Sequence, residues 1–243
     1  MSLKSILFKK LGYRKMDGKH QIIHHIDAQK KLINNKTTPL ILDVGANIGQ
    51  TAKMYRSKFP QATIYSFEPV PESFQKLKTK FQNDKLVKPY QLALSEHTGE
   101  VNFYINKQSE SCSLLSSASE GTNWCPPGAL ETIKTVSVPS MTLDHFCSRE
   151  GINHIDILKM DAQGGELMVL KGAHDLLLKG SIDVIYTEVL FVPLYDGQAY
   201  FHDLSLLLSR YGYLLFDIFD KRHAKNGNVK WADAIFIKHR DLL

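Results

Sequence analysis

A buried strand followed by a glycine turn and a helix is the feature that most constrains the fold of this chain. The apolar run Leu40–Val44 contains one acid, Asp43, and the turn that follows begins at Gly45. A second apolar strand, Thr63–Phe67, is followed directly by another acid, Glu68. Strand, glycine turn, helix and acid-tipped strand in this order are typical of a nucleoside-binding βαβ unit, in which a carboxylate holds the ribose hydroxyls.

The glycine spacing indicates which nucleoside the turn accepts. A dinucleotide-binding turn reads Gly-x-Gly-x-x-Gly, so that a pyrophosphate rests against bare backbone at the helix N-terminus. Counted from Gly45, the second and third glycines are replaced by Asn47 and Gln50. The pattern is instead Asp-x-Gly-x-x-x-Gly, from Asp43 to Gly49, which provides a carboxylate for a cationic amine. We therefore predict S-adenosylmethionine (SAM) as the cofactor, because it carries an amine and a sulfonium but no phosphate.

The composition is that of a globular domain with one basic end. The 243 residues are 43% hydrophobic and 23% charged, enough for one large domain with a substantial core. Residues 1–37 hold nine Lys or Arg against two acids, although the whole chain carries a net charge of only +5. The remainder is slightly acidic, which argues against a nucleic-acid partner. Three cysteines without metal or disulfide spacing, no membrane-spanning apolar run and no evident signal peptide favour a cytoplasmic location.

The chain is predicted to divide at about residue 37. Residues 1–37 form a basic helical segment, with apolar residues at helical spacing from Leu3 to Leu11 and again from Ile22 to Leu32. This segment either caps the domain or makes a peripheral contact with an anionic membrane surface; we favour capping. Residues 38–243 form the second unit, and the sequence gives no indication of the oligomeric state.

Residues 38–243 alternate strands and helices. Repeated βαβ units favour a mostly parallel seven-stranded sheet with helices on both faces, and a strand-turn-strand ending makes the last strand antiparallel. This is an α/β fold of Rossmann-like type. Strands are expected at 40–44, 62–67, 87–93, 154–160, 182–187, 212–218 and 232–237, and helices at 49–58, from Pro71, from Gly165 and at 201–210.

One stretch, at about residues 100–138, breaks the alternation and is predicted to be an inserted hairpin with a lid loop. Apolar residues alternate at both ends of this stretch, whereas 107–131 is rich in Ser and contains Trp124. Long irregular loops inside compact domains are often lids or binding loops. A polar loop with one large aromatic suits a polyol or glycan, so we expect acceptor choice to depend on 107–131 and on 189–200.

The chain resembles the FkbM-type methyltransferases, SAM-dependent enzymes with the Rossmann-like fold of class I methyltransferases. The resemblance runs from about Leu40 to Phe236. Its four segments are Asp43-Val44-Gly45-Ala46-Asn47-Ile48-Gly49; Phe67-Glu68-Pro69; Ala93-Leu94-Ser95 with Gly99; and Leu158-Lys159-Met160-Asp161-Ala162-Gln163-Gly164-Gly165-Glu166. The last is the most distinctive segment, usually Asp-x-Glu-Gly-x-Glu, and here Gln163 replaces the first Glu.

This resemblance implies O-methylation of a hydroxyl on a sugar, glycan or polyketide-like metabolite. It also implies that the glycine turn lies along the methionine part of SAM, Glu68 on the ribose and Ala93-Leu94 beside the adenine. The predicted cofactor-binding residues are Asp43, Gly45, Ala46, Asn47, Gly49, Thr51, Glu68, Pro69, Ala93 and Leu94.

Two further acids at strand ends, Asp161 and Glu188, are the predicted catalytic residues. They end successive strands, at the edge where open α/β sheets bind ligands. A hydroxyl acceptor needs a general base within hydrogen-bond reach, and either acid could accept its proton. The same pair could hold Mg²⁺, which prefers oxygen ligands, although we do not favour a metal. His97, His174 and His202 are weaker candidates for the base.

Three other functions are considered. An NAD-dependent oxidoreductase shares the fold class, but the two missing glycines weigh against it. A nucleic-acid methyltransferase would carry an Asn-Pro-Pro-aromatic segment after strand 154–160, which is not found there. A non-catalytic SAM-binding protein is disfavoured because acids are intact at every strand end that would face the cofactor.

Overall fold

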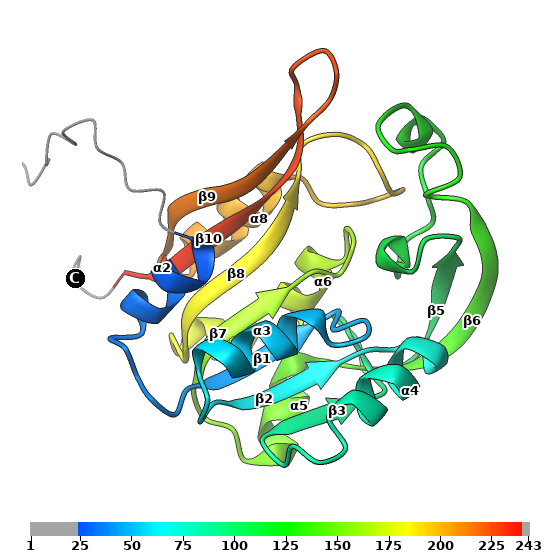
Figure 1. The fold of residues 1–243 in the computed structure, drawn as a ribbon. Coiled ribbons are helices and arrows are strands. Elements are labelled where there is room, and N and C mark those ends of the chain that lie inside the picture. Colours follow the sequence, from blue (N-terminus) through cyan, green and yellow to red (C-terminus); the bar gives the residue numbers. More distant parts are fainter. Residues whose placement is uncertain (1–23, 240–243) are drawn as a thin grey trace, which may run out of the picture.

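The computed structural model describes residues 24–239, and its centre is a seven-stranded sheet in the order β3-β2-β1-β7-β8-β10-β9 (Figure 1). Strand β10 pairs antiparallel with both β8 and β9, whereas the other pairs in this sheet are parallel. The predicted Rossmann-like α/β fold is therefore confirmed. The strands are β1 (Leu40–Val44), β2 (Thr63–Phe67), β3 (Val87–Tyr90), β7 (Ile155–Met160), β8 (Ile182–Leu190), β9 (Tyr213–His223) and β10 (Val229–Lys238).

Helices cover both faces of the sheet. Alternate residues of each central strand point to opposite faces, so Ile41 packs with α2 and α3 while Leu42 packs with α5 to α8. The helices are α2 (His25–Leu32), α3 (Gln50–Lys58), α4 (Pro71–Lys80), α5 (Leu143–Glu150), α6 (Glu166–Lys171), α7 (His174–Leu178) and α8 (Phe201–Arg210). Within the described part of the chain, no helix combines the length and the apolarity needed to cross a membrane.

A second, three-stranded sheet stands beside the first (Figure 1). It consists of β4 (Ala93–Leu94), β6 (Thr132–Met141) and β5 (Gly99–Asn106), in that order. Strands β5 and β6 pair antiparallel, and residues 107–131 connect them through the short helices η1 (Ser109–Ser111) and η2 (Ser119–Asn123). A bridge between Ser117 and Tyr195 joins this connection to the segment after β8.

Several predicted elements are wrong in detail. The strand expected at 87–93 ends at Tyr90, and Ala93–Leu94 pairs with β6, because the chain passes from one sheet to the other at this point. Helix α5 was not predicted, although Thr142 caps its N-terminus and Gly151 its C-terminus. The helix expected from Gly165 is two short helices. The stretch from Leu3 to Leu11 lies outside the described residues, and the division at residue 37 stays a prediction.

Candidate active site

An open cavity of about 800 Å³, here called the first cavity, lies at the carboxyl ends of β1 and β2. This is the edge at which open α/β sheets bind ligands. Its floor is the glycine turn, and one wall is apolar, with Phe67, Leu92 and Phe103 beside β4. Most predicted cofactor-binding residues line it: Gly45, Ala46, Asn47, Thr51, Glu68, Pro69, Ala93 and Leu94.

The glycine turn passes directly over the end of β7. The backbone amide of Asp161 donates to the carbonyl oxygen of Val44 at 3.1 Å. Gly45 has φ of +72°, and a Cβ at this position would overlap the carbonyl oxygen of Asp161. Only glycine satisfies both conditions, so the turn is held tightly against β7 and leaves its other side open to the cavity.

Glu68 fastens the turn from the neighbouring strand. Its carboxylate accepts hydrogen bonds from the backbone amides of Asn47, at 2.8 Å, and Val70, at 2.9 Å. Burial raises the pKa of Glu68 to about 7, and the two backbone hydrogen bonds oppose that rise. The carboxylate keeps lone pairs on the cavity side that can accept hydrogen bonds from ligand hydroxyls.

Asn47 supplies an unsatisfied acceptor in the same cavity. Its side-chain oxygen is buried and has no hydrogen-bond partner among the described residues. A buried acceptor without a donor costs about 1–3 kcal/mol, so a ligand with a donor at this place would be stabilised by it. The polar turn and the apolar wall together fit a ligand with a charged or hydroxylated part and a flat apolar part.

Asp43 and Gly49 do not line this cavity. Asp43 is fully buried beneath the turn, where Nζ of Lys159 lies 3.2 Å from its Oδ1 and 3.7 Å from Oδ2 of Asp161. Burial lowers the pKa of Lys159, but the charges of Asp43 and Asp161 outweigh this, so the net shift is upward. Gly49 packs under Leu77 and Phe81 at the start of α3. The Asp43 carboxylate is thus directed at Lys159.

Sequence reasoning missed Lys159 as a site residue, although a signal was present. It is the one cation in the otherwise apolar second half of β7, and buried lysines are almost always paired. Asp161 comes two positions after Lys159, with only Met160 between them, so the alternation of the strand places both side chains on the same face of the sheet. The partner on β1 depends on strand register, which the sequence does not reveal.

The structure brings the two predicted catalytic acids together through Gln163. The Nε2 of Gln163 donates to Oδ1 of Asp161 at 2.6 Å and to Oε2 of Glu188 at 3.0 Å. The hydroxyl of Tyr195 lies 2.9 Å from Oε1 of the same amide. The amide group therefore bridges the two carboxylates, and its own orientation is fixed by Tyr195.

A further acid, Asp233, lies beside this pair and was not predicted. Asp233 is the register partner of Glu188 on β10, and its Oδ2 accepts a hydrogen bond from the hydroxyl of Tyr186 at 2.7 Å. Burial raises the pKa of Asp233 to about 6. Burial also raises the pKa of Glu188, and the charges of neighbouring acids, Asp161 first, add to the shift.

A second cavity, of about 770 Å³, opens beside these acids on the face of the sheet that α2 and α3 cover. Asp161, Glu188 and Asp233 line it, together with Trp231 of β10 and His25 of α2. The residues that line both cavities are Thr51, Lys159 and Asp161. The other candidates line neither cavity: His97, His174, His202 and Trp124.

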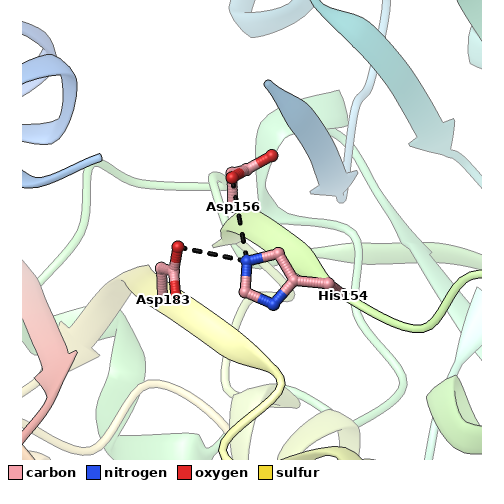
Figure 2. Close-up of side chains that lie close together, drawn as sticks. All are labelled: His154, Asp156 and Asp183. Carbon is pink, nitrogen blue, oxygen red and sulfur yellow. Dashed lines mark hydrogen bonds and ion pairs between the residues drawn. The ribbon is translucent and has the colours of Figure 1, made fainter. Parts of the chain in front are cut away.

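A third group of polar side chains lies at the opposite end of the sheet. His154, Asp156 and Asp183 approach one another closely enough to hold a metal ion (Figure 2). The carboxylate of Asp156 already accepts hydrogen bonds from Nζ of Lys36, at 2.9 Å to each oxygen, and from the amide of Leu40. The group therefore ties the segment before β1 to the sheet, at the amino ends of β7 and β8.

Comparisons with known proteins identify the family of this chain. The model of the methyltransferase FkbM domain matches residues 43–215. The 2-O-methyltransferase NoeI of Sinorhizobium fredii is 27% identical over 67% of this chain and 68% of its own length. The hexuronic acid methyltransferase AglP of Haloferax volcanii is 28% identical over 62% of this chain and 55% of its own length, and the methyltransferase sdnD of Sordaria araneosa is 29% identical over 59% and 64%.

Proposed function

The chain belongs to the methyltransferase FkbM domain family, and we propose that it transfers a methyl group from SAM to a hydroxyl of a sugar, glycan or polyketide-like metabolite. The observation that carries this proposal is the first cavity, where the glycine turn and Glu68 meet directly beside Asp161. Two relatives support this class of acceptor. NoeI, a 2-O-methyltransferase, supports transfer to an oxygen, and AglP, a hexuronic acid methyltransferase, supports a carbohydrate-like acceptor.

Each part of the first cavity suits one part of SAM. Glu68 would accept hydrogen bonds from the ribose hydroxyls, and the apolar wall with Ala93 and Leu94 would hold the adenine. The turn at Asn47 would hold the methionine part, with the unpaired side-chain oxygen of Asn47 accepting from its amine. SAM supplies a methyl group already activated by the sulfonium, so the protein has mainly to position the acceptor.

Asp161 and Glu188 are the proposed acceptors of the proton from the hydroxyl. An aliphatic hydroxyl becomes a useful nucleophile only as its proton leaves, which requires a base within hydrogen-bond reach. Both carboxylates line the second cavity. Because the pKa of Glu188 is raised, its ionised form is a stronger base than an ordinary carboxylate. Gln163 would keep the two groups in place without adding a charge.

A shared Mg²⁺ is the less favoured arrangement. The space between Asp161 and Glu188 is occupied by the amide nitrogen of Gln163, which donates hydrogen bonds and cannot act as a metal ligand. The residues at this place therefore fit a proton acceptor better than a metal centre.

The direct test is calorimetric titration of the protein with SAM, S-adenosylhomocysteine and NAD. We expect micromolar binding of the first two, lost in Glu68→Ala, and no binding of NAD. Binding of NAD alone would instead support an oxidoreductase. Tight SAM binding without methyl transfer to any hydroxylated acceptor would support a non-catalytic SAM-binding protein.

A further inference from the structure

We propose that the second cavity binds the methyl acceptor as an uncharged polyhydroxyl ring and discriminates against acceptors that carry a carboxylate. In this arrangement acceptor hydroxyls donate to the carboxylates of the cavity, and one face of the ring lies against Trp231. The inference rests on the proposed methyl transfer and specifies the class of acceptor for it.

The position of the second cavity fits an acceptor site. It shares Thr51, Lys159 and Asp161 with the first cavity, so a molecule bound in it lies next to one bound there. The two proposed proton acceptors, Asp161 and Glu188, lie at this junction. An acceptor hydroxyl in the second cavity would therefore meet both a base and the methyl donor.

The charges of the second cavity favour a neutral ligand. Four acids line it, against two permanent cations, and one of these, Lys159, is already paired with Asp43. The remaining cation, Arg222, is exposed on β9. Burial lowers the pKa of His25, so this ring adds no positive charge near neutral pH. Carboxylates accept hydrogen bonds from hydroxyls, whereas an acceptor carboxylate would meet like charge. The lining acids are Asp161, Glu188, Asp220 and Asp233.

The outer wall is shaped by an irregularity in β9. Between Trp231 and Asp233 the register on β9 moves from Arg222 to Phe219, so β9 carries an extra residue. Asp220 lies in this bulge with φ of +47°, and its carboxylate is 4.0 Å from Nε2 of His25. Bulges often redirect a side chain beside an active site, and here one turns Asp220 toward the cavity.

Two aromatic groups give the cavity surfaces for an apolar ring face. Trp231 is partly buried against Leu190 and its neighbours and also lines the cavity. On the other side the ring of His25 stacks on Tyr186, with centroids 4.8 Å apart. Helix α2 thus forms part of the acceptor wall, which gives this helix a role beyond covering the sheet.

Binding of matched glycosides tests the proposal. The full chain is saturated with S-adenosylhomocysteine, after SAM binding has been established by calorimetry. Saturation-transfer NMR then compares methyl β-D-glucopyranoside with methyl β-D-glucuronide at millimolar concentration. We expect the neutral glycoside to bind at least about tenfold more tightly, since like charges in a cavity disfavour the uronide. Equal or tighter binding of the uronide, or SAM binding without binding of either glycoside, would overturn the inference while leaving methyl transfer in place.

Three variants locate the site. Trp231→Ala should abolish glycoside binding, whereas Trp124→Ala should not, because Trp124 packs on the same apolar cluster but lines neither cavity. Asp220→Asn keeps a residue type that tolerates positive φ and should strengthen uronide binding several-fold. SAM affinity is measured for each variant and should not change.

Two outcomes would contradict this assignment. Loss of glycoside binding in Trp124→Ala with retention in Trp231→Ala would move the acceptor to the 107–131 loop. Failure of SAM to bind the unaltered protein would instead reject the proposed function itself.

Discussion

The ammonium group of Lys159 lies 3.2 Å from Oδ1 of Asp43, with both side chains almost completely buried. The two residues are register partners on β7 and β1, the central parallel pair of the sheet. Apart from Lys159, the carboxylate oxygens of Asp43 have no polar partner among the described residues, so this ion pair is what compensates the charge of Asp43. The pair lies directly beneath the glycine turn and couples the stability of the sheet to the shape of the first cavity.

Removing Lys159 should therefore be strongly destabilising. We expect Lys159→Met, which keeps the length of the side chain, to lower the free energy of unfolding in urea by about 3–5 kcal/mol, because Asp43 is left buried without a partner. Lys171→Met is the control: Lys171 is half exposed and pairs with Glu96 at 3.1 Å, so its loss should cost at most about 1 kcal/mol. Equal effects of the two substitutions would show that the buried pair contributes little.

The raised pKa of Glu68 predicts a pH-dependent stability. An acid whose pKa rises on folding, here from 4.5 to about 7, binds its proton more tightly in the folded state. Its contribution is complete below pH 4.5 and is lost as the pH rises to about 7. Glu68→Gln removes this titration. The free energy of unfolding of the variant, relative to that of the unaltered protein, should therefore increase by about 1–3 kcal/mol as the pH rises from about 4.5 to about 7. Urea unfolding of the ligand-free proteins at several pH values measures the difference, and a constant difference would contradict it.

Gln163 should control the pH dependence of catalysis. Gln163→Glu would place a third carboxylate within about 3 Å of Asp161 and Glu188, where an amide now donates to both. Repulsion should raise the pKa values of the group, and the acidic limb of the kcat/KM profile should move up by about one unit or more. Gln163→Met removes the bridging amide without adding charge. It should lower kcat but move the acidic limb of the kcat/KM profile less than Gln163→Glu does. An unchanged profile in Gln163→Glu would mean that neither acid is the base.

Local sequence patterns predicted the bounds of individual strands and helices better than the side-chain contacts between them. Strand β1 and helix α8 were predicted with correct bounds, because apolar periodicity and polar turns define them locally. The pairing of Asp43 with Lys159 and of Glu188 with Asp233 was not predicted, because register between distant strands decides which side chains meet. The second cavity was missed for the same reason, since α2, β8 and the β9–β10 hairpin come together only in three dimensions.

The reaction should not require a divalent metal ion. The amide nitrogen of Gln163 donates to both Asp161 and Glu188, so it lies where a metal ion shared by these two acids would have to sit. We expect methyl transfer, once an acceptor is available, to keep its full rate after dialysis against EDTA. Restoration of a lost rate by added Mg²⁺ would contradict this and would assign the two acids to a metal site.

We expect position 45 to tolerate no side chain, because a side chain there would collide with the neighbouring backbone. A second glycine with the same φ but open surroundings separates this collision from the strain of the left-handed backbone. Gly45 and Gly197 both have φ of +72°, but a Cβ on Gly197 would meet no atom within 4 Å, whereas a Cβ on Gly45 would overlap the carbonyl oxygen of Asp161. Gly197→Ala should cost only the left-handed backbone energy, about 1–2 kcal/mol. Gly45→Ala must also displace the turn from β7, so it should cost more in urea unfolding and weaken SAM binding at least about tenfold, because the turn forms the floor of the first cavity. If both variants lost the same stability and bound SAM normally, the close approach of the turn to Asp161 would not be what shapes the cavity.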